Sequence, residues 1–186
     1  MSKEYIHYGH KEFNPELFNP VKTSLLRNKP SGGLWASPKD AEHGWKQWNE
    51  VEEFAECNEE NSFSFVLSES ANVCHLYSVA DLEQLPKQKM PEGYIDFGTG
   101  AVYPDFEAAL AMGYDAIELH LSEEDRTNLG FMEGLYDSLY GWDCDSIVIL
   151  NPDIVIPLER EIKEAGDTDD ILDNLGTEDQ EEDWEL

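Results

Sequence analysis

Residues 29–38 read Lys-Pro-Ser-Gly-Gly-Leu-Trp-Ala-Ser-Pro, and the rest of the chain is interpreted outward from this stretch. The paired glycines, Gly32 and Gly33, permit a tight backbone and the close approach of a flat or phosphorylated ligand. The three residues that follow favour a short strand. Ser37-Pro38 has the form of a helix start, because serine is a common N-cap and proline a common first helical residue. The stretch therefore predicts a strand that leads directly into a helix over residues 38–57.

Aromatic and hydroxyl side chains make this stretch a candidate ligand site. Trp35 offers a face on which a ring can stack, and the Ser37 hydroxyl can either hold a ribose or simply cap the helix. Trp45 and Trp48 fall on one face of the predicted helix, which is more typical of core residues than of a binding site. Gly33, Trp35 and Ser37 are therefore candidate ligand-binding residues, with capping as the alternative for Ser37.

The segment before this stretch predicts a first strand and a long loop. Residues 4–9 alternate in character and are rich in aromatic and branched side chains, and they end at a glycine turn. His7 on this strand is a candidate hydrogen-bonding group for a ligand, and a purely structural role is the alternative. Three X-Pro pairs across residues 10–30 predict a loop with one short helical turn near residues 16–18.

The remaining segments predict a mixed fold. Strands are expected over residues 62–67, 73–79, 114–121, 146–150 and 154–157, and helices over residues 80–85, 104–112 and 122–139. The first two of these strands are expected to form a hairpin, and residues 94–97 to form a short strand or a lining loop. Regular alternation of strands and helices is absent, which favours one α+β domain with a mixed, mostly antiparallel sheet and three or four helices. We expect this domain to span residues 1–158, followed by an acidic segment over 159–186, first helical and then disordered.

Acidic residues lie at two places where catalysis could use them. The run 141–146 precedes the most apolar strand, and a buried acid without partners is costly, so Asp143 and Asp145 face solvent or serve a site. There an acid can stabilise a developing cation or act as a general base, or else only cap a turn. On the strand over 114–121, alternation places Glu118 and His120 on one face, as an acid–base pair or as the wet face of an edge strand.

Charge is the most unusual property of the composition. The chain has 41 acidic and 12 basic residues, a net charge of −29, and residues 1–158 alone carry −18. Such a field repels nucleic acid and anionic membranes and attracts basic proteins. It is consistent with solubility in a salty habitat, with a basic protein partner, or with mimicry of DNA. Direct binding to nucleic acid is not expected.

Several other classes of protein are disfavoured. Cys57, Cys74 and Cys144 are too far apart for a zinc knuckle and odd in number for a disulfide framework, and no close His/Cys/Asp cluster predicts a metal site. Glycine-rich phosphate loops, the dinucleotide glycine fingerprint and a serine nucleophile elbow are also absent. No apolar run reaches the roughly 18–20 residues of a membrane span, and the N-terminus lacks a signal pattern. We expect a soluble, cytoplasmic protein.

The order of these features resembles the ADP-ribosyltransferase-like fold. The resemblance rests on residues 4–56, where a strand with His7 and a Pro-containing loop precede Gly-Gly-Leu-Trp-Ala-Ser, and on the closing strands over 142–158. It implies NAD as the cofactor, with His7 and Ser37 at the nicotinamide ribose and Trp35 lining the pocket, and it extends the cofactor-binding set to Gly33 and Ser146.

The chain departs from that family at the catalytic acid. Where a Glu is expected near the last strands, this sequence has Asp143, Asp145 and Ser146. Either an Asp substitutes, or Glu118 serves, or transferase activity has been lost. Two functions follow: an NAD-using ADP-ribosyltransferase-like enzyme, or a non-enzymatic acidic protein, of a kind encoded by phages or mobile elements. The latter would act as an inhibitor or nucleic-acid mimic on a basic host protein.

Overall fold

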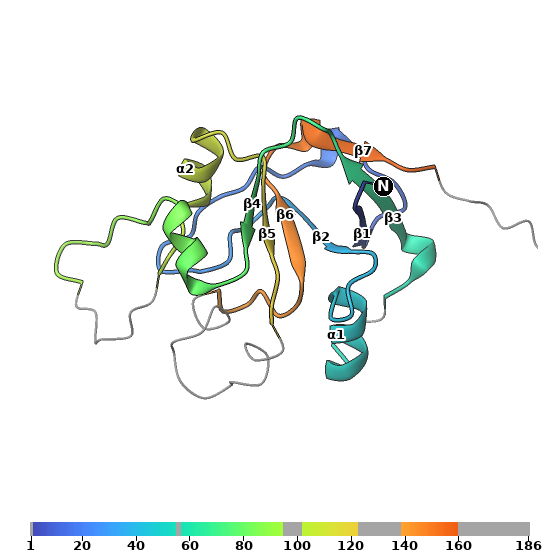
Figure 1. Ribbon diagram of the computed structural model, residues 1–186, viewed down its shortest axis with the longest axis horizontal. Coiled ribbons are helices and arrows are strands. Elements are labelled where there is room, and N and C mark those ends of the chain that lie inside the picture. Colours follow the sequence, from blue (N-terminus) through green and yellow to red (C-terminus); the bar gives the residue numbers. More distant parts are fainter. Residues whose placement is uncertain (1, 55–56, 95–101, 123–138, 160–186) are drawn as a thin grey trace, which may run out of the picture.

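A seven-stranded open sheet organises the chain (Figure 1). The computed structural model describes residues 2–54, 57–94, 102–122 and 139–159. The strands are β1 (Glu4–Tyr8), β2 (Leu34–Pro38), β3 (Ser62–Leu67), β4 (Val73–Leu76), β5 (Ala116–Leu119), β6 (Ser146–Ile149) and β7 (Val155–Pro157). Their spatial order is β4-β5-β6-β2-β1-β3-β7, and the described pairs are antiparallel apart from the parallel pair β4–β5. The predicted mixed, mostly antiparallel α+β domain is confirmed.

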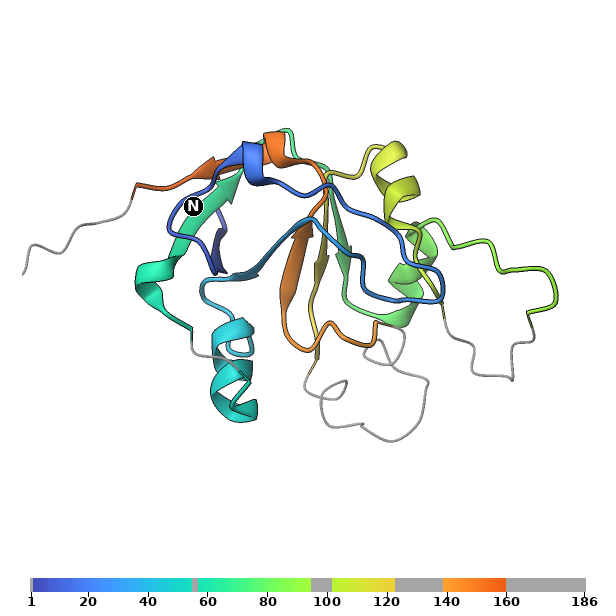
Figure 2. The same cartoon turned by 180° about the vertical axis from the view of Figure 1, so that it is seen from behind.

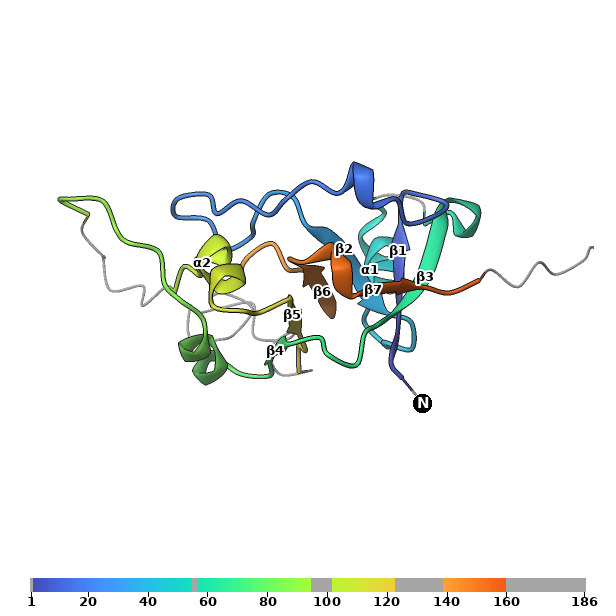
Figure 3. The same cartoon turned by 90° about the horizontal axis from the view of Figure 1, so that it is seen from above.

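Short helices connect these strands. The α-helices are α1 (Trp45–Glu52) and α2 (Phe106–Ala111), and the 3-10 helices are η1 (Pro15–Leu17), η2 (Glu59–Asn61), η3 (Val79–Gln84) and η4 (Pro152–Ile154). The two α-helices lie toward opposite ends of the sheet, α1 near β1 and β2, and α2 beyond β4–β6 (Figure 2, Figure 3). No helix in the described ranges is long and apolar enough to cross a membrane.

The helix predicted over residues 38–57 begins later than expected. Ser37 and Pro38 end β2, because they pair with Ile6 and Tyr5 of β1. Residues 39–44 form turns, and α1 starts only at Trp45. Ser37 nevertheless caps this helix from a distance, since its Oγ accepts a hydrogen bond from the backbone N–H of Trp45 at 2.8 Å.

The hairpin predicted between residues 62–67 and 73–79 does not form. β3 pairs with β1 and β7, whereas β4 pairs in parallel with β5 at the opposite edge of the sheet. The connection between β3 and β4 instead runs along the upper edge of the sheet in Figure 1, and there the Ser68 N–H donates to the Ile154 carbonyl. Alternation and a polar connection predict two strands correctly, but they do not say whether the strands pair with each other.

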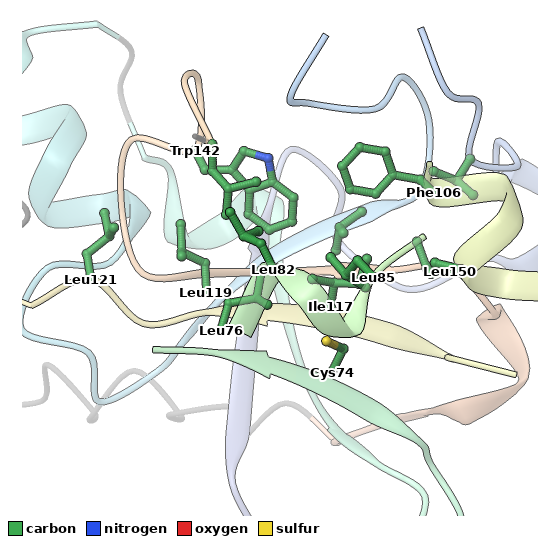
Figure 4. Close-up of a cluster of buried hydrophobic side chains, with 14 residues drawn as sticks. Cys74, Leu76, Leu82, Leu85, Phe106, Ile117, Leu119, Leu121, Trp142 and Leu150 are labelled. Atoms are coloured by element: carbon green, nitrogen blue, oxygen red, sulfur yellow. The ribbon is translucent and has the colours of Figure 1, made fainter. Parts of the chain in front are cut away.

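Two apolar clusters cover the opposite faces of the sheet. Cross-strand partners share a face, so Trp35 and Val148 lie on one face while Ala36 and Ile147 lie on the other. The first face carries the larger cluster: Val21, Cys74, Leu76, Leu82, Leu85, Phe106, Ala109, Ile117, Leu119, Leu121, Leu139, Trp142, Val148 and Leu150 (Figure 4). The second face carries Tyr5, Leu34, Ala36, Phe63, Phe65, Ala116, Ile147, Ile149, Ile154 and Val155.

The tryptophans of α1 do not fill this core. Trp45 and Trp48 are only half-buried and stack on each other at 5.1 Å between ring centroids. Val51, which follows them on the helix, is 78% exposed, and the buried residue of α1 is Asn49. The prediction that these tryptophans are core residues is therefore wrong, and Trp45 is available to line a surface cavity.

Three sequence predictions lie outside the described residues. They are most of the short segment over 94–97, the helix over 122–139 and the acidic C-terminal segment, except at their first residues and at Leu139.

Candidate functional site

A cavity of about 170 Å³ lies where β1 and β2 diverge. The two strands share only two residue pairs, and beyond them the His7 side chain contacts β2, its Nδ1 lying 2.7 Å from the Trp35 carbonyl oxygen. Residues from β1, β2, α1 and the start of β6 surround the space. The lining residues are Ile6, His7, Tyr8, Lys29, Trp35, Ala36, Ser37, Trp45, Trp142, Asp143, Cys144 and Ser146.

Three tryptophans and Tyr8 are among the lining residues. Trp35 and Trp142 meet edge to face, with 4.7 Å between ring centroids. Both indole N–H groups are already satisfied, that of Trp35 by the Gly32 carbonyl at 3.1 Å and that of Trp142 by the Asn28 carbonyl at 2.9 Å. The Lys29 ammonium lies 4.6 Å from the Trp35 ring centroid. The tryptophans therefore present π surface to the cavity rather than hydrogen-bond donors.

His7 reaches the cavity from β1 with a neutral imidazole, whose ring also packs on Phe63 of the second face. Burial lowers the pKa of His7, and the hydrogen bond to the Trp35 carbonyl only partly opposes this effect. The ring is therefore uncharged near pH 7, and Nδ1 must carry the proton because it faces a carbonyl acceptor. Nε2 is then an acceptor, 3.1 Å from Nδ1 of His10. A ligand hydroxyl can donate to the same nitrogen by displacing His10.

Asp143 is the carboxylate that lines the cavity. It is half-buried, and no hydrogen bond to its carboxylate is found within the described part of the chain. The neighbouring Cys144 is a poor nucleophile, because burial raises its pKa to about 12. The Ser146 hydroxyl donates to the Cys144 carbonyl at 3.0 Å, so it is held by the backbone. Asp143 is consequently the lining acid best placed to respond to a ligand's charge.

The cavity brings together five of the eight residues predicted from the sequence: His7, Trp35, Ser37, Asp143 and Ser146. Gly33 does not line the cavity, and it lies against β6 instead. Its φ is +70°, and a Cβ there would lie 2.7 Å from Cγ2 of Val148 and 3.0 Å from the Ile149 carbonyl oxygen. Gly33 thus lets β2 approach β6 closely.

Asp145 also lies outside the cavity lining, where it bonds the backbone of a neighbouring segment. Its Oδ1 accepts the Leu121 N–H at 2.7 Å, and its own N–H donates to the His43 carbonyl at 3.0 Å. Asp145 therefore joins the end of β5 to the start of β6, and Asp143 remains the candidate site residue of the two.

Glu118 lies on the other face of the sheet and is fully buried. The wet-face alternative for Glu118 is therefore wrong. Lys3 Nζ lies 2.6 Å from Oε1, and Tyr5 OH and His75 Nδ1 each lie 3.1 Å from Oε2. Burial alone would raise the pKa of Glu118, but hydrogen bonds from His120 and Lys3 outweigh it and lower the pKa to about 2. Glu118 is a permanently charged carboxylate at neutral pH, remote from the cavity lining.

A second, more polar hollow of about 360 Å³ adjoins the cavity. The two share Ile6, Tyr8, Ser37 and Trp45. Lys39 and Lys46 line the second hollow, and each is held near an acid, Glu4 at 2.8 Å and Glu59 at 2.9 Å. An apolar cavity thus opens toward a surface with ammonium groups.

Sequence reasoning missed four lining residues with functional character: Tyr8, Lys29, Trp45 and Trp142. Trp142 belongs to the run 141–146 that also contains Asp143, but its position beside Trp35 depends on the pairing of β2 with β6. That pairing has no local sequence pattern. Comparison with models of known families, with curated proteins and with solved structures finds no match to this chain.

Proposed function

We propose that this protein is an ADP-ribosyltransferase-like enzyme that binds NAD with its nicotinamide ring in the aromatic cavity. The observation that carries the proposal is the convergence of His7, Trp35, Ser37 and Asp143 on one cavity, because these residues come from separate segments of the chain. The resemblance of residues 4–56 and 142–158 to that family assigns the same residues to the same ligand.

The size and lining of the cavity suit one planar ring. A buried apolar cavity of about 150 Å³ accepts benzene, and this cavity has about 170 Å³ and is lined by Trp35, Trp45 and Trp142. A cationic pyridinium ring is attracted to an aromatic face by cation–π interaction, and it would take the place of the Lys29 ammonium over Trp35. The sugar and phosphates of NAD would then extend into the neighbouring hollow, where Lys39 and Lys46 can approach the phosphates.

The cavity side chains supply the elements of a dissociative transfer. Neutral His7 accepts a hydrogen bond from a ribose hydroxyl through Nε2 and so orients the sugar. As the bond between ribose C1′ and the ring nitrogen breaks, its electron pair leaves with neutral nicotinamide. The Asp143 carboxylate stabilises the positive charge left on the sugar. A hydroxyl, carboxylate or water oxygen then bonds to C1′, and any proton it loses passes to solvent.

The test separates binding from turnover. NAD should raise the melting temperature of the full-length protein, and at about 100 times its dissociation constant it should stabilise the fold by about 2.7 kcal/mol. Free nicotinamide, measured by chromatography, should accumulate. Asp143→Asn should lower nicotinamide release at least 100-fold, about 2.7 kcal/mol of transition-state stabilisation, with little change in NAD binding.

Matched variants define the outcome. Asp153→Asn makes the same chemical change at an exposed acid of η4, and should leave both readings unchanged. His7→Ala should weaken NAD binding and turnover together. If NAD produces neither a melting shift nor nicotinamide, the proposal is wrong. If NAD binds but Asp143→Asn turns it over normally, the assignment of the acid is wrong.

A second function rests on the charge. Residues 1–158 hold 28 acidic and 10 basic residues, a net charge of −18, which favours a basic protein partner over nucleic acid. A non-enzymatic inhibitor or nucleic-acid mimic would bind its partner with a steep loss of affinity between about 50 and 500 mM salt, and DNA would compete. Saturable 1:1 binding to a purified basic protein that is insensitive to salt and to DNA would contradict this function.

A further inference from the structure

Two histidines and a glutamate gather on the second face of the sheet, at the parallel pair β4–β5. His75 of β4 is the register partner of Glu118 of β5, so their side chains share a face. His120 lies two residues after Glu118 and joins them. Their nearest side-chain nitrogen and oxygen atoms all lie within 4.8 Å of one another. Because His75 and His120 are 45 residues apart in the chain, no sequence spacing predicts this cluster.

The three donor atoms form a nearly equilateral triangle. Oε2 of Glu118 lies 3.1 Å from Nδ1 of His75 and 3.5 Å from Nε2 of His120, and the two nitrogens lie 3.4 Å apart. In a tetrahedral zinc site with bonds of about 2.0–2.1 Å, neighbouring ligand atoms are separated by about 3.3 Å. The triangle therefore has the dimensions of one face of a zinc tetrahedron, without movement of the backbone.

Hydrogen bonding alone explains this arrangement poorly. Tyr5 OH, His75 Nδ1 and His120 Nε2 all approach Oε2 of Glu118, whereas Lys3 is the group on Oε1. Of these three groups, the Tyr5 hydroxyl makes a hydrogen bond to Oε2, and an imidazole nitrogen that carries no proton is an acceptor rather than a donor. A cation bound between the imidazole nitrogens and Oε2 would accept a lone pair from each of the three atoms and leave the Tyr5 hydrogen bond in place.

The surroundings resemble the outer shell of a metal site. Lys3 and Tyr5 fix the orientation of the carboxylate, and the ring of Tyr77 stacks on His120 with 4.3 Å between centroids. Outer-shell contacts of this kind hold metal ligands in position. The His75 side chain is 45% exposed, so solvent reaches the cluster at this histidine.

We propose that His75, Glu118 and His120 form a binding site for a divalent transition metal, with Zn²⁺ as the best-suited ion and one position open to water or an external donor. Two imidazoles and a carboxylate with an open position are a common ligand set for zinc. The site is separate from the aromatic cavity, because none of His75, Glu118 and His120 lines that cavity. It does not depend on the proposed use of NAD.

The experiment uses Co²⁺ as a spectroscopic probe and Zn²⁺ as its competitor on the full-length protein. A large excess of Mg²⁺ in the buffer occupies the many surface carboxylates. We expect one equivalent of Co²⁺ to give the intense visible absorption of a four-coordinate ion, and one equivalent of Zn²⁺ to remove it. His75→Ala and His120→Ala should each weaken binding at least 100-fold, with an unchanged circular dichroism spectrum.

Two control variants exclude other ligands. His43→Ala removes an exposed histidine outside the cluster, and Cys57→Ser removes the most accessible described thiol; both should retain full binding. Absence of the cobalt spectrum would overturn the proposal, as would equal affinity in the His75→Ala/His120→Ala double variant. The cluster would then be a hydrogen-bonded charge network.

Discussion

Two carboxylates on opposite sides of the central sheet differ in their hydrogen bonding. On one face, the Asp143 carboxylate borders an apolar cavity, with no hydrogen bond to it in the described residues. On the other, the Glu118 carboxylate is fully buried and surrounded by Lys3, Tyr5 and two histidines. In the first arrangement, the negative charge of Asp143 can interact with a ligand. In the second, the surrounding side chains compensate the negative charge of Glu118, which can hold neighbouring strands together or bind a cation. Accessible polar groups without a hydrogen-bond partner, rather than acidic residues as such, are therefore the better candidates for a reaction site.

The largest effect on stability is expected at Gly33, where β2 lies close to β6. Gly33→Ala should destabilise the protein by about 3 kcal/mol, because a left-handed backbone costs about 1–2 kcal/mol for other residues and overpacking adds about 1–3. The new Cβ would meet Val148 and the Ile149 backbone. Urea unfolding measures the change. Gly113→Ala, also left-handed but with open space around it, is the control, and an equal loss in both would show that packing at Gly33 is unimportant.

Glu118→Gln should lower the free energy of unfolding by an amount that depends on pH. The Glu118 pKa is about 2 in the folded protein against an ordinary value of 4.5, so its charge contributes about 3 kcal/mol that is present above the unfolded pKa. That contribution disappears as pH falls from about 5 to 2. The difference in unfolding free energy between wild type and variant should therefore shrink over this range, whereas Glu69→Gln at an exposed position should show none. Parallel stability curves would refute the assignment.

Ser37→Ala should affect only the first face. The variant removes the acceptor of the Trp45 N–H, and loss of such a cap costs about 1 kcal/mol. Chemical denaturation measures this loss, and we expect no change in cobalt binding at the cluster of His75, Glu118 and His120. Ser70→Ala, at an exposed loop position, provides the baseline. A stability loss in both variants alike would show that the capping bond contributes nothing.

The smallest effect is expected from the cavity rim. Trp45→Leu replaces a half-buried aromatic wall, so the affinity for an aromatic ring should fall by about 2–5-fold, equivalent to about 0.5–1 kcal/mol. Nicotinamide binding, followed by tryptophan fluorescence or by NMR, measures the change. Val51→Ala on the exposed side of α1 should leave the affinity unchanged. An equal loss in both variants would place the ring elsewhere.

Local patterns were sufficient for most elements and for five of the twelve residues that line the cavity. The strands around His7, Trp35 and Ser146 follow from alternation and apolar runs, and so does the shared face of Glu118 and His120. Pairing was not accessible, because β4 and β5 join segments that no turn connects. The metal-like triangle and the contact of Trp35 with Trp142 both depend on such pairing. The start of α1 was misplaced because Ser37-Pro38 satisfies the pattern of a helix cap while it occupies a strand.

The long path of the chain between β2 and β6 also determines when the cavity can exist during folding. Its walls come from residues near positions 6–8, 35–45 and 142–146, so the antiparallel pairing of Trp35 with Val148 must close before a ring can bind. Pairings of such large sequence separation raise the contact order, and high contact order slows folding. A ligand of this cavity could therefore bind only after β1, β2 and β6 have come together.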